Sequence, residues 1–292
     1  MKYQVLINPM AGSGDKTEQI NALSSFFDGE ICCHEVTEIG SYNDFIASLD
    51  EEDIIVLCGG DGTLNRFAND TQNTVIKNEI LYYAIGTGND FLRDIEKQPD
   101  AAPFSVKEYI TDLPVVEING KQYHFLNNVG FGIDGYCCEV GDEIKKISDK
   151  PVNYTAIAIK GLLFHYKPTN ATVVVDGVTH HYKKVWIAPT MKGRFYGGGM
   201  MPTPKQDRKD PEGKLSLMLF YGKGKIATLL AFPSLFKGEH VKHTDMVAIH
   251  EGKDITVTFD RPSTIQIDGE TIVGVTEYHA MAKVPAADAA FV

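Results

Sequence analysis

Strand-like and helix-like patterns alternate along the first third of the chain. Strand-like runs, several of them rich in β-branched side chains, occupy residues 3–7, 31–36, 54–58 and 81–85. Between them, residues 16–27 and 42–49 place apolar side chains at helical spacing, and a further helix is expected from Asn89. This alternation predicts a parallel sheet covered by helices, with ligands binding where the strands end.

From about Pro114 the pattern changes to short strands separated by turn residues. Asn119-Gly120 and Asp176-Gly177 favour two-residue hairpin turns. Strands are expected at 115–118, 123–128, 171–175, 178–186, 214–220, 246–250, 254–259 and 264–267. Helices are expected at 153–164 and 225–236, the second stopping or kinking near Pro233. The sequence thus predicts an α/β domain over residues 1–114 and an antiparallel β-rich domain over 115–277.

Composition limits the partners and the compartment. The 292 residues are 43% hydrophobic, which is enough for two real cores. The net charge of −11 argues against nucleic acid and gives no general attraction to anionic membranes, so any lipid must be met locally. The five cysteines show no CxxC spacing and no disulfide framework, which indicates a reducing compartment. With no leader-like or membrane-spanning stretch, we expect a cytoplasmic protein, peripheral to the membrane at most.

The segment GGDGTLN at 59–65 carries the first candidate chemistry. It follows the apolar run 54–58, and its glycines allow a tight turn and leave backbone amides open to a ligand. A helix starting at this turn would point its N-terminal amides at the same place, which is where a phosphate binds. Asp61 adds one carboxylate for a metal or a proton, although an aspartate here can also cap a helix.

Two more motifs accompany GGDGTLN. NPMAGSG lies before it at 8–14, and GTGNDFLR lies after it at 86–93. In order and spacing, the three segments resemble the nucleotide-site motifs of the diacylglycerol kinase catalytic family, which includes sphingosine and ceramide kinases and the YegS-like lipid kinases of bacteria. The resemblance implies an NAD-kinase-like nucleotide domain, a β-sandwich domain, and ATP and Mg²⁺ as cofactors. It also implies that the chain returns to the first domain from about residue 278.

By that resemblance the nucleotide site is assigned residue by residue. Asp61 lies at the metal-bound phosphates and is a candidate base, while Asp90 and Arg93 line the site or, alternatively, only pair with each other across one helix turn. Many relatives have a basic residue at the position where this chain has Ser13, so an ordinary surface role stays open for Lys16. The full set is Asn8, Lys16, Thr37, Gly59, Gly60, Asp61, Gly62, Thr63, Asn65, Thr87, Asp90, Arg93 and Lys160.

A second acidic motif lies near the end of the chain. Residues 265–270, IQIDGE, predict a strand closing in an Asp-Gly turn, which a simple hairpin would explain. In the family, the glutamate of this DGE motif is the proposed proton acceptor for the lipid hydroxyl, and Glu270 matches it. Glu117 matches a further acidic position that supports the cluster.

An oxygen-rich run at 207–215 suggests a second metal site. Asp207, Asp210 and Glu212 offer ligands for Mg²⁺ or Ca²⁺, although a solvated loop has the same composition. Relatives bind a structural Mg²⁺ in a related stretch, and here the sequence departs from theirs.

The sequence is therefore interpreted as an ATP-dependent lipid kinase in which Glu270, with Asp61, serves the acceptor hydroxyl. The expected partners are a lipid or other alcohol acceptor and, transiently, a membrane surface; a homodimer stays open. Two alternatives remain: an NAD kinase-like enzyme, which shares the GGDGT loop, and a non-catalytic nucleotide or lipid sensor.

Overall fold

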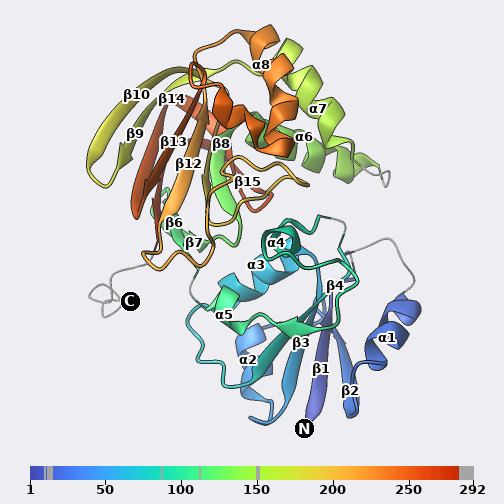
Figure 1. Ribbon diagram of the computed structural model, residues 1–292. Helices are drawn as coiled ribbons and strands as arrows, with labels where there is room; N and C mark the ends of the chain where they lie inside the picture. The colour runs from blue at the N-terminus through green and yellow to red at the C-terminus, as the bar shows by residue number, and fades with distance from the viewer. Residues whose placement is uncertain (10, 12–15, 87, 112, 149–151, 283–292) are drawn as a thin grey trace. The chain divides into compact units, whose positions relative to one another are not determined.

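The computed structural model describes residues 1–9, 11, 16–86, 88–111, 113–148 and 152–282, with backbone alone for residues 16–19. It divides into two compact units, Met1–Leu113 and Pro114–Val292 (Figure 1). This division lies one residue from the boundary expected at 114.

The first unit is a mostly parallel sheet in the order β2-β1-β3-β4-β5. The parallel strands are β1 (Lys2–Ile7), β2 (Glu30–Glu35), β3 (Ile54–Gly59) and β4 (Glu79–Ala84), and β5 (Phe104–Ser105) runs antiparallel to β4. The helices are α1 (Lys16–Ser24), α2 (Tyr42–Ala47), α3 (Asp61–Asp70), α4 (Asp90–Asp94) and α5 (Lys107–Ile110). The predicted alternation of strands and helices is confirmed.

Helices pack on both faces of this sheet because its strands are apolar on both sides. Val5 and Val56 pack with Leu23 of α1 on one face. On the other, Phe67 of α3 meets Tyr42 of α2 edge to face, with ring centroids 5.2 Å apart. The sheet is therefore buried in the way that the continuous apolar runs predict.

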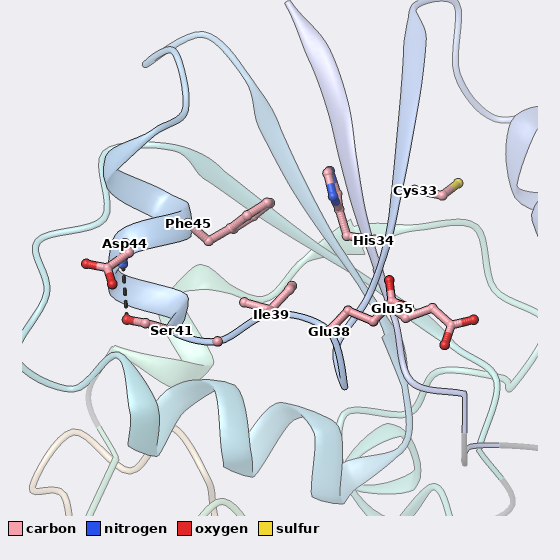
Figure 2. Close-up of a pocket in the computed structure, with 9 residues that line it drawn as sticks. Cys33, His34, Glu35, Glu38, Ile39, Ser41, Asp44 and Phe45 are labelled. Carbon is pink, nitrogen blue, oxygen red and sulfur yellow. Dashed lines mark hydrogen bonds between the residues drawn. The ribbon is translucent and has the colours of Figure 1, made fainter.

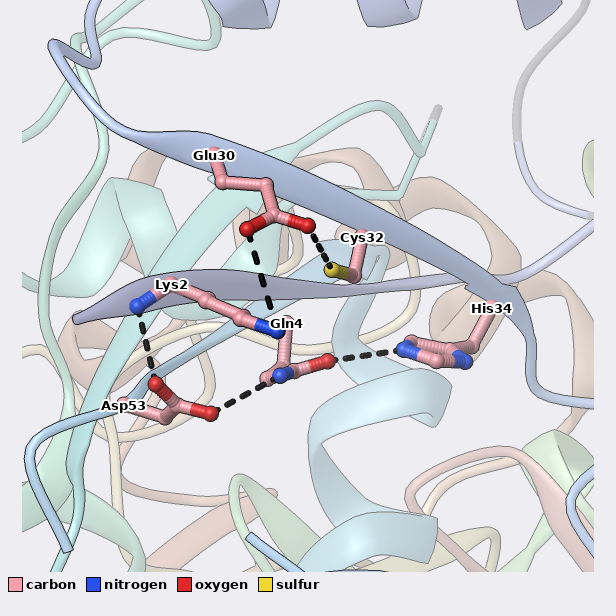
Figure 3. Close-up of polar contacts among 6 residues, drawn as sticks. All are labelled: Lys2, Gln4, Glu30, Cys32, His34 and Asp53. Carbon is pink, nitrogen blue, oxygen red and sulfur yellow. Dashed lines mark hydrogen bonds and ion pairs between the residues drawn. The ribbon is translucent and has the colours of Figure 1, made fainter. Parts of the chain in front are cut away.

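A polar chain links the first three strands (Figure 3). The buried Asp53 accepts hydrogen bonds from the Lys2 amide at 2.8 Å and from the Gln4 side chain at 2.9 Å. Gln4 in turn contacts the ring of His34 through Oε1 at 2.8 Å. The hydrogen bond from Gln4, followed by that from the Lys2 amide, lowers the pKa of Asp53 against its burial. These contacts join β1 to β2 and to the residue before β3.

The second unit is an antiparallel sheet in the order β13-β12-β11-β8-β14-β15-β6-β7, with β9 paired to β14 and β10 to β9. Its strands are β6 (Val115–Ile118), β7 (Lys121–His124), β8 (Asn128–Gly132), β9 (Thr169–Val175), β10 (Val178–Val185), β11 (Ile187–Met191), β12 (Leu215–Phe220), β13 (Val247–Gly252), β14 (Asp254–Ile267) and β15 (Glu270–Met281). The helical elements are α6 (Ile133–Ile147), α7 (Tyr154–Lys160), the π-helix η1 (Gly161–His165), α8 (Lys225–Ala231) and the 3-10 turns η2 (Phe232–Lys237) and η3 (Glu239–Lys242).

The turn residues behave as their chemistry predicts. Asn119, Asp176 and Asp268 each adopt a positive φ of 47–52° and are each followed by a glycine with positive φ. That pair of conformations is the two-residue turn that Asx-Gly favours. Helix α8 ends at Ala231, before Pro233, as expected.

Three features differ from the sequence prediction. Helix α6 and strand β8 fill residues for which the pattern predicts little, because the glycines at 130, 132 and 135 interrupt it. Strand β11 follows β10 almost directly, in a stretch to which the sequence pattern assigns no element. The return to the first domain from about residue 278 is not seen over residues 278–281, which pair with β6 and β14 inside the second unit. Residues 283–292 lie outside the described part.

Candidate functional site

Three loops meet at the carboxyl ends of β1, β3 and β4. The Asn8 amide donates to the Cys58 carbonyl at 3.0 Å, and the Asn8 side chain donates to Thr63 Oγ1 at 2.9 Å. The amides of Ile85 and Gly86 donate to the Gly59 carbonyl at 3.0 and 3.2 Å. The structure thus brings together the NP, GGDGT and GTGND segments, as expected for the ends of neighbouring parallel strands.

Glycines in these loops serve two different purposes. A Cβ on Gly59 would lie 2.2 Å from Thr63 Oγ1, and one on Gly86 would lie 2.7 Å from the Gly60 Cα, so the loops could not pack with larger residues. Among the described residues, a Cβ on Gly62 or Gly88 would meet nothing within 4 Å, and the φ of Gly62 is not positive. Contacts among the described residues therefore explain why positions 59 and 86 are glycine. The same contacts give no packing reason for glycine at positions 62 and 88.

Asp61 joins two of the loops. Its Oδ2 accepts the backbone amides of Asp90 at 2.9 Å and of Phe91 at 3.2 Å, at the start of α4. The aspartate is the first residue of α3 but caps the helix of the next motif, 29 residues along the chain. The charge of a carboxylate at a helix N-terminus is favourable there.

Three more of the predicted nucleotide residues, Asn65, Asp90 and Arg93, lie on α3 and α4, the two helices that Asp61 joins. Arg93 Nη1 is 3.5 Å from Asp90 Oδ1, so the two residues do pair across one turn; Asp90 is buried and Arg93 is 52% exposed. Asn65 is buried in α3 and accepts the side chain of Asn69 through its carbonyl at 2.9 Å and through Oδ1 at 3.2 Å. Thr87 lies outside the described residues. Lys16 begins α1, and its side chain also lies outside the described part.

A hollow of about 590 Å³ opens beside the turn that follows β2 (Figure 2). Thr37 is exposed in that turn, and β2 is the sheet neighbour of β1, with Glu35 opposite Ile7. The rings of His34 and Phe45 meet edge to face at 4.9 Å, and Ser41 caps α2 by accepting the Asp44 amide at 3.3 Å. The lining residues are Cys33, His34, Glu35, Glu38, Ile39, Gly40, Ser41, Asp44 and Phe45.

In the second unit, the DGE motif forms the turn between β14 and β15. Asp268 accepts the amides of Asn127 at 2.8 Å and of Asn128 at 2.9 Å, together with that of Leu126. Burial raises the pKa of its carboxyl, while these amides and Arg208 act in the opposite direction. Glu270 is the first residue of β15 and is exposed. Asp268 therefore fixes the turn, and Glu270 extends from it into solvent.

A buried acid that the motifs do not predict supports this turn. Asp134, in the first turn of α6, accepts the Gln266 side chain through Oδ2 at 3.3 Å. Gln266 Oε1 accepts the Gly269 amide at 3.0 Å, next to Glu270. A Cβ on Gly135 would lie 2.2 Å from the Thr264 carbonyl, so α6 packs directly on the backbone of β14. Burial raises the pKa of Asp134 to about 6.

The sequence held one signal for Asp134. GFGIDG at 130–135 is a glycine-rich strand-to-helix turn with a single acid, like GGDG at 59–62. Its importance rests on Gln266, a partner 132 residues away, which no local pattern identifies.

Two predicted residues of the second unit lie apart from Glu270. Glu117 is opposite His279, nine residues along β15 from Glu270, so the structure does not bring the two glutamates together. Lys160 ends α7 and is exposed.

The run at 207–215 is a turn closed by its own side chains. Asp210 accepts the amides of Glu212 at 3.2 Å and of Lys214 at 2.8 Å, which lowers its pKa. Asp207 accepts the Lys209 amide at 2.9 Å, and Glu212 pairs with Lys214 at 2.7 Å. Within the described ranges, no three His, Cys, Asp or Glu side chains cluster as a metal site would require. Metal binding by this loop stays a prediction.

Comparison with known proteins agrees with this architecture. Residues 2–116 match the model of the diacylglycerol kinase catalytic domain, and residues 127–287 match that of the YegS C-terminal NAD kinase beta sandwich-like domain. The chain belongs to the diacylglycerol kinase family. Members of this family are lipid kinases, so the chain is an enzyme of that class and uses a nucleotide.

Three similar proteins share this architecture or sequence at low identity. YtlR of Bacillus subtilis, whose name describes a candidate lipid kinase, is 24% identical over 77% of this chain and 75% of its own length. A diacylglycerol kinase of Mycobacterium tuberculosis is 26% identical over 70% of this chain and 66% of its own. The crystal structure of a diacylglycerol kinase from Bacillus anthracis has the same fold, with a TM-score of 0.60 at 19% identity over 98% of this chain and 97% of that one.

Two expectations from composition can also be compared with the structure. All five cysteines are free in the structure. In the described part of the chain, no helix has the length and apolar character needed to cross a membrane.

Proposed function

We propose that this lipid kinase transfers the γ-phosphoryl group of ATP, in a Mg²⁺-dependent reaction, to the hydroxyl of a diacylglycerol-like lipid. The observation that carries the proposal is the open backbone at Gly62 and Gly88. Glycine weakens a helix relative to alanine by up to about 1 kcal/mol, and none of the described residues packs closely enough to require it at Gly62. A phosphate resting against the first turn of α3 supplies the missing reason, because a side chain would occupy its place.

The residues around this loop suit a nucleotide with its metal. In α3 the amides of Thr63 and Leu64 donate to the Gly60 carbonyl at 2.9 and 3.3 Å, and the N-terminus of the helix carries a partial positive charge that favours phosphate oxygens. Arg93 is half exposed and can turn its guanidinium from Asp90 to a phosphate. Mg²⁺ is usually held by one or two carboxylates and by the phosphates themselves, and among the described residues Asp61 and Asp90 offer carboxylates beside this loop. When bound, the ion would neutralise phosphate charge.

Glu270 serves the acceptor in this proposal. The acceptor oxygen attacks the γ-phosphorus while the bond to the β,γ-bridging oxygen breaks, so ADP leaves and the hydroxyl proton passes to the Glu270 carboxylate. Glu270 follows a turn whose backbone is held by Asp268 and Gln266, while its own side chain is exposed. This combination suits a base that meets an incoming substrate.

One assay tests the activity and the acceptor together. The protein is incubated with γ-labelled ATP, Mg²⁺ and a total lipid extract, and labelled products are identified by mass spectrometry. A phosphorylated lipid, absent with Glu270→Gln and present with Glu277→Gln on the same strand, supports the proposal. Labelled NADP from added NAD, with no labelled lipid, would make the chain an NAD kinase. No product from any acceptor, despite ATP binding, would make it a nucleotide sensor.

A further inference from the structure

The run at 207–215 contains a buried cation among exposed charges. Arg208 is 8% exposed, whereas Asp207 and Lys209 on either side of it are exposed. An arginine is almost never buried without partners, because its guanidinium stays charged at physiological pH and loses its hydration when it leaves water. The contacts of this side chain therefore show what the loop is attached to.

Arg208 binds the segment that precedes β8. Its Nη1 donates to the Leu126 carbonyl, and its Nη2 donates to Asn127 Oδ1 at 2.7 Å. Both of these neighbouring residues are at most 3% exposed. A planar guanidinium reaches two such acceptors at once, whereas the ammonium of a lysine is a single point of charge without this fork. The geometry at this position therefore favours arginine over lysine.

The same segment is bonded to the DGE turn. Asp268 accepts the amides of Leu126 and of Asn127, the second at 2.8 Å, and its own amide donates to the Asn128 carbonyl at 3.0 Å. Burial raises the pKa of the Asp268 carboxyl, and the positive charge of Arg208 is one of the influences that oppose this rise. A continuous set of contacts thus connects Arg208 to the residue that lies two positions before the proposed base.

The loop that carries Arg208 is itself fixed to the sheet. The buried Gln206 donates from Nε2 to the Lys214 carbonyl at 2.9 Å, and its Oε1 accepts the hydroxyl of Ser216 on β12. Asp210 closes the loop by accepting the Lys214 amide at 2.8 Å. The guanidinium is therefore held on a braced loop, so its own position is well defined.

We propose that Arg208 is a positioning residue, which holds the DGE turn and thereby sets the position of the Glu270 carboxylate. Without the guanidinium, the buried Leu126 carbonyl loses a donor and Asp268 loses a nearby cation, so the contacts weaken at both ends. The inference rests on the proposed function in one respect, namely that Glu270 is the base that serves the acceptor hydroxyl.

Steady-state kinetics with ATP, Mg²⁺ and dispersed diacylglycerol separate positioning from nucleotide binding. Arg208→Ala should lower kcat about 100-fold, because a misplacement of about 1 Å costs this much, while the KM for ATP stays within a few-fold. Arg208→Lys keeps the charge but not the fork, so we expect a loss of about ten-fold. Lys205→Ala, at an exposed lysine three residues away, is the control and should behave like the wild type.

Guanidinium ion provides a rescue that a purely structural role would not predict for kcat. It is added to Arg208→Ala at about 20 mM, far below the molar concentrations that unfold proteins. The ion can occupy the space of the missing side chain and donate to the same acceptors. We expect kcat to recover at least about ten-fold, on the scale of a charge-assisted hydrogen bond, with no recovery in sodium chloride at the same concentration.

Hydrogen exchange measures the turn without any substrate. In Arg208→Ala, the amides of Asp268 and Gly269 should exchange at least about ten-fold faster than in the wild type, while those of β9 keep their wild-type rates. Scanning calorimetry shows that each variant is folded.

Three results would overturn the inference. These are wild-type exchange of the turn amides in folded Arg208→Ala, a kcat of that variant within about two-fold of wild type, or guanidinium restoring its melting temperature without restoring kcat. A wild-type protein that phosphorylates no lipid would instead refute the proposed function, and the exchange rates would still decide whether Arg208 holds the turn.

Discussion

The substitution Gly62→Ala should separate stability from nucleotide binding. Gly62 is the second residue of α3, its φ is not positive, and an added Cβ has no neighbour within 4 Å in the part of the chain that the structure describes. Alanine in place of glycine favours a helix and restricts the unfolded chain, which together are worth about 0.5–1 kcal/mol. We therefore expect the first unit to melt a few degrees higher than in the wild type.

The same methyl group should weaken ATP binding. If phosphate oxygens rest against the first turn of α3, the Cβ overlaps with them, and overlap in a packed site costs about 1–3 kcal/mol. That range corresponds to a loss of affinity of about 5- to 150-fold. Titration calorimetry with ATP and Mg²⁺ measures the affinity, and scanning calorimetry measures the melting temperature.

Two other glycines provide the comparison. Gly224→Ala in the second unit, also at an open position, should leave ATP affinity unchanged. Gly59→Ala should destabilise the first unit by several kcal/mol, on the scale of strongly overpacked sites, because its Cβ would clash with Thr63. If Gly62→Ala raised the melting temperature while ATP affinity stayed within two-fold of wild type, the phosphates would not lie on this loop.

Three further substitutions test single carboxylates. Asp61→Asn should cost about 1 kcal/mol of stability, because the cap on α4 is weakened, and should lower turnover about 100-fold or more. Asp70→Asn, at the end of α3, is the control and should do neither. Near-normal turnover of Asp61→Asn would mean that Asp61 is only a helix cap. Glu270→Gln should keep ATP affinity within a few-fold and lower turnover about 100-fold, with Glu277→Gln as the control; affinity falling in parallel with activity would contradict a role as base. Burial raises the pKa of Asp134 in the folded protein from its ordinary 3.8 to about 6, so its stabilising contribution is present below pH 4 and is lost as pH rises through 6. The free energy of unfolding of Asp134→Asn should therefore rise relative to wild type by up to about 3 kcal/mol between pH 4 and 7, as denaturant melts would measure; a constant difference would mean that Asp134 titrates normally.

The sequence alone determined the features that depend on neighbouring residues. Apolar runs predicted the parallel strands of the first unit, and the three Asx-Gly pairs predicted turns that adopt the expected positive φ angles. The loop GGDGTLN was correctly placed between a strand and a helix. Each of these follows from backbone preferences or from the side-chain period of a single element, both of which are local.

Only the tertiary structure decided what several of these residues contact. In the structure Asp61 accepts the Asp90 amide of α4, the helix of the next motif, 29 residues along the chain. Asp134 accepts the side chain of Gln266, 132 residues away, and is connected through it to the DGE turn. It also left Ile226 and Leu230 outside the core although they are as apolar as the buried Leu235. Hydrophobic periodicity shows that a residue can be buried, but burial and hydrogen bonding depend on which other elements the fold places beside it, and that information lies far away in the chain.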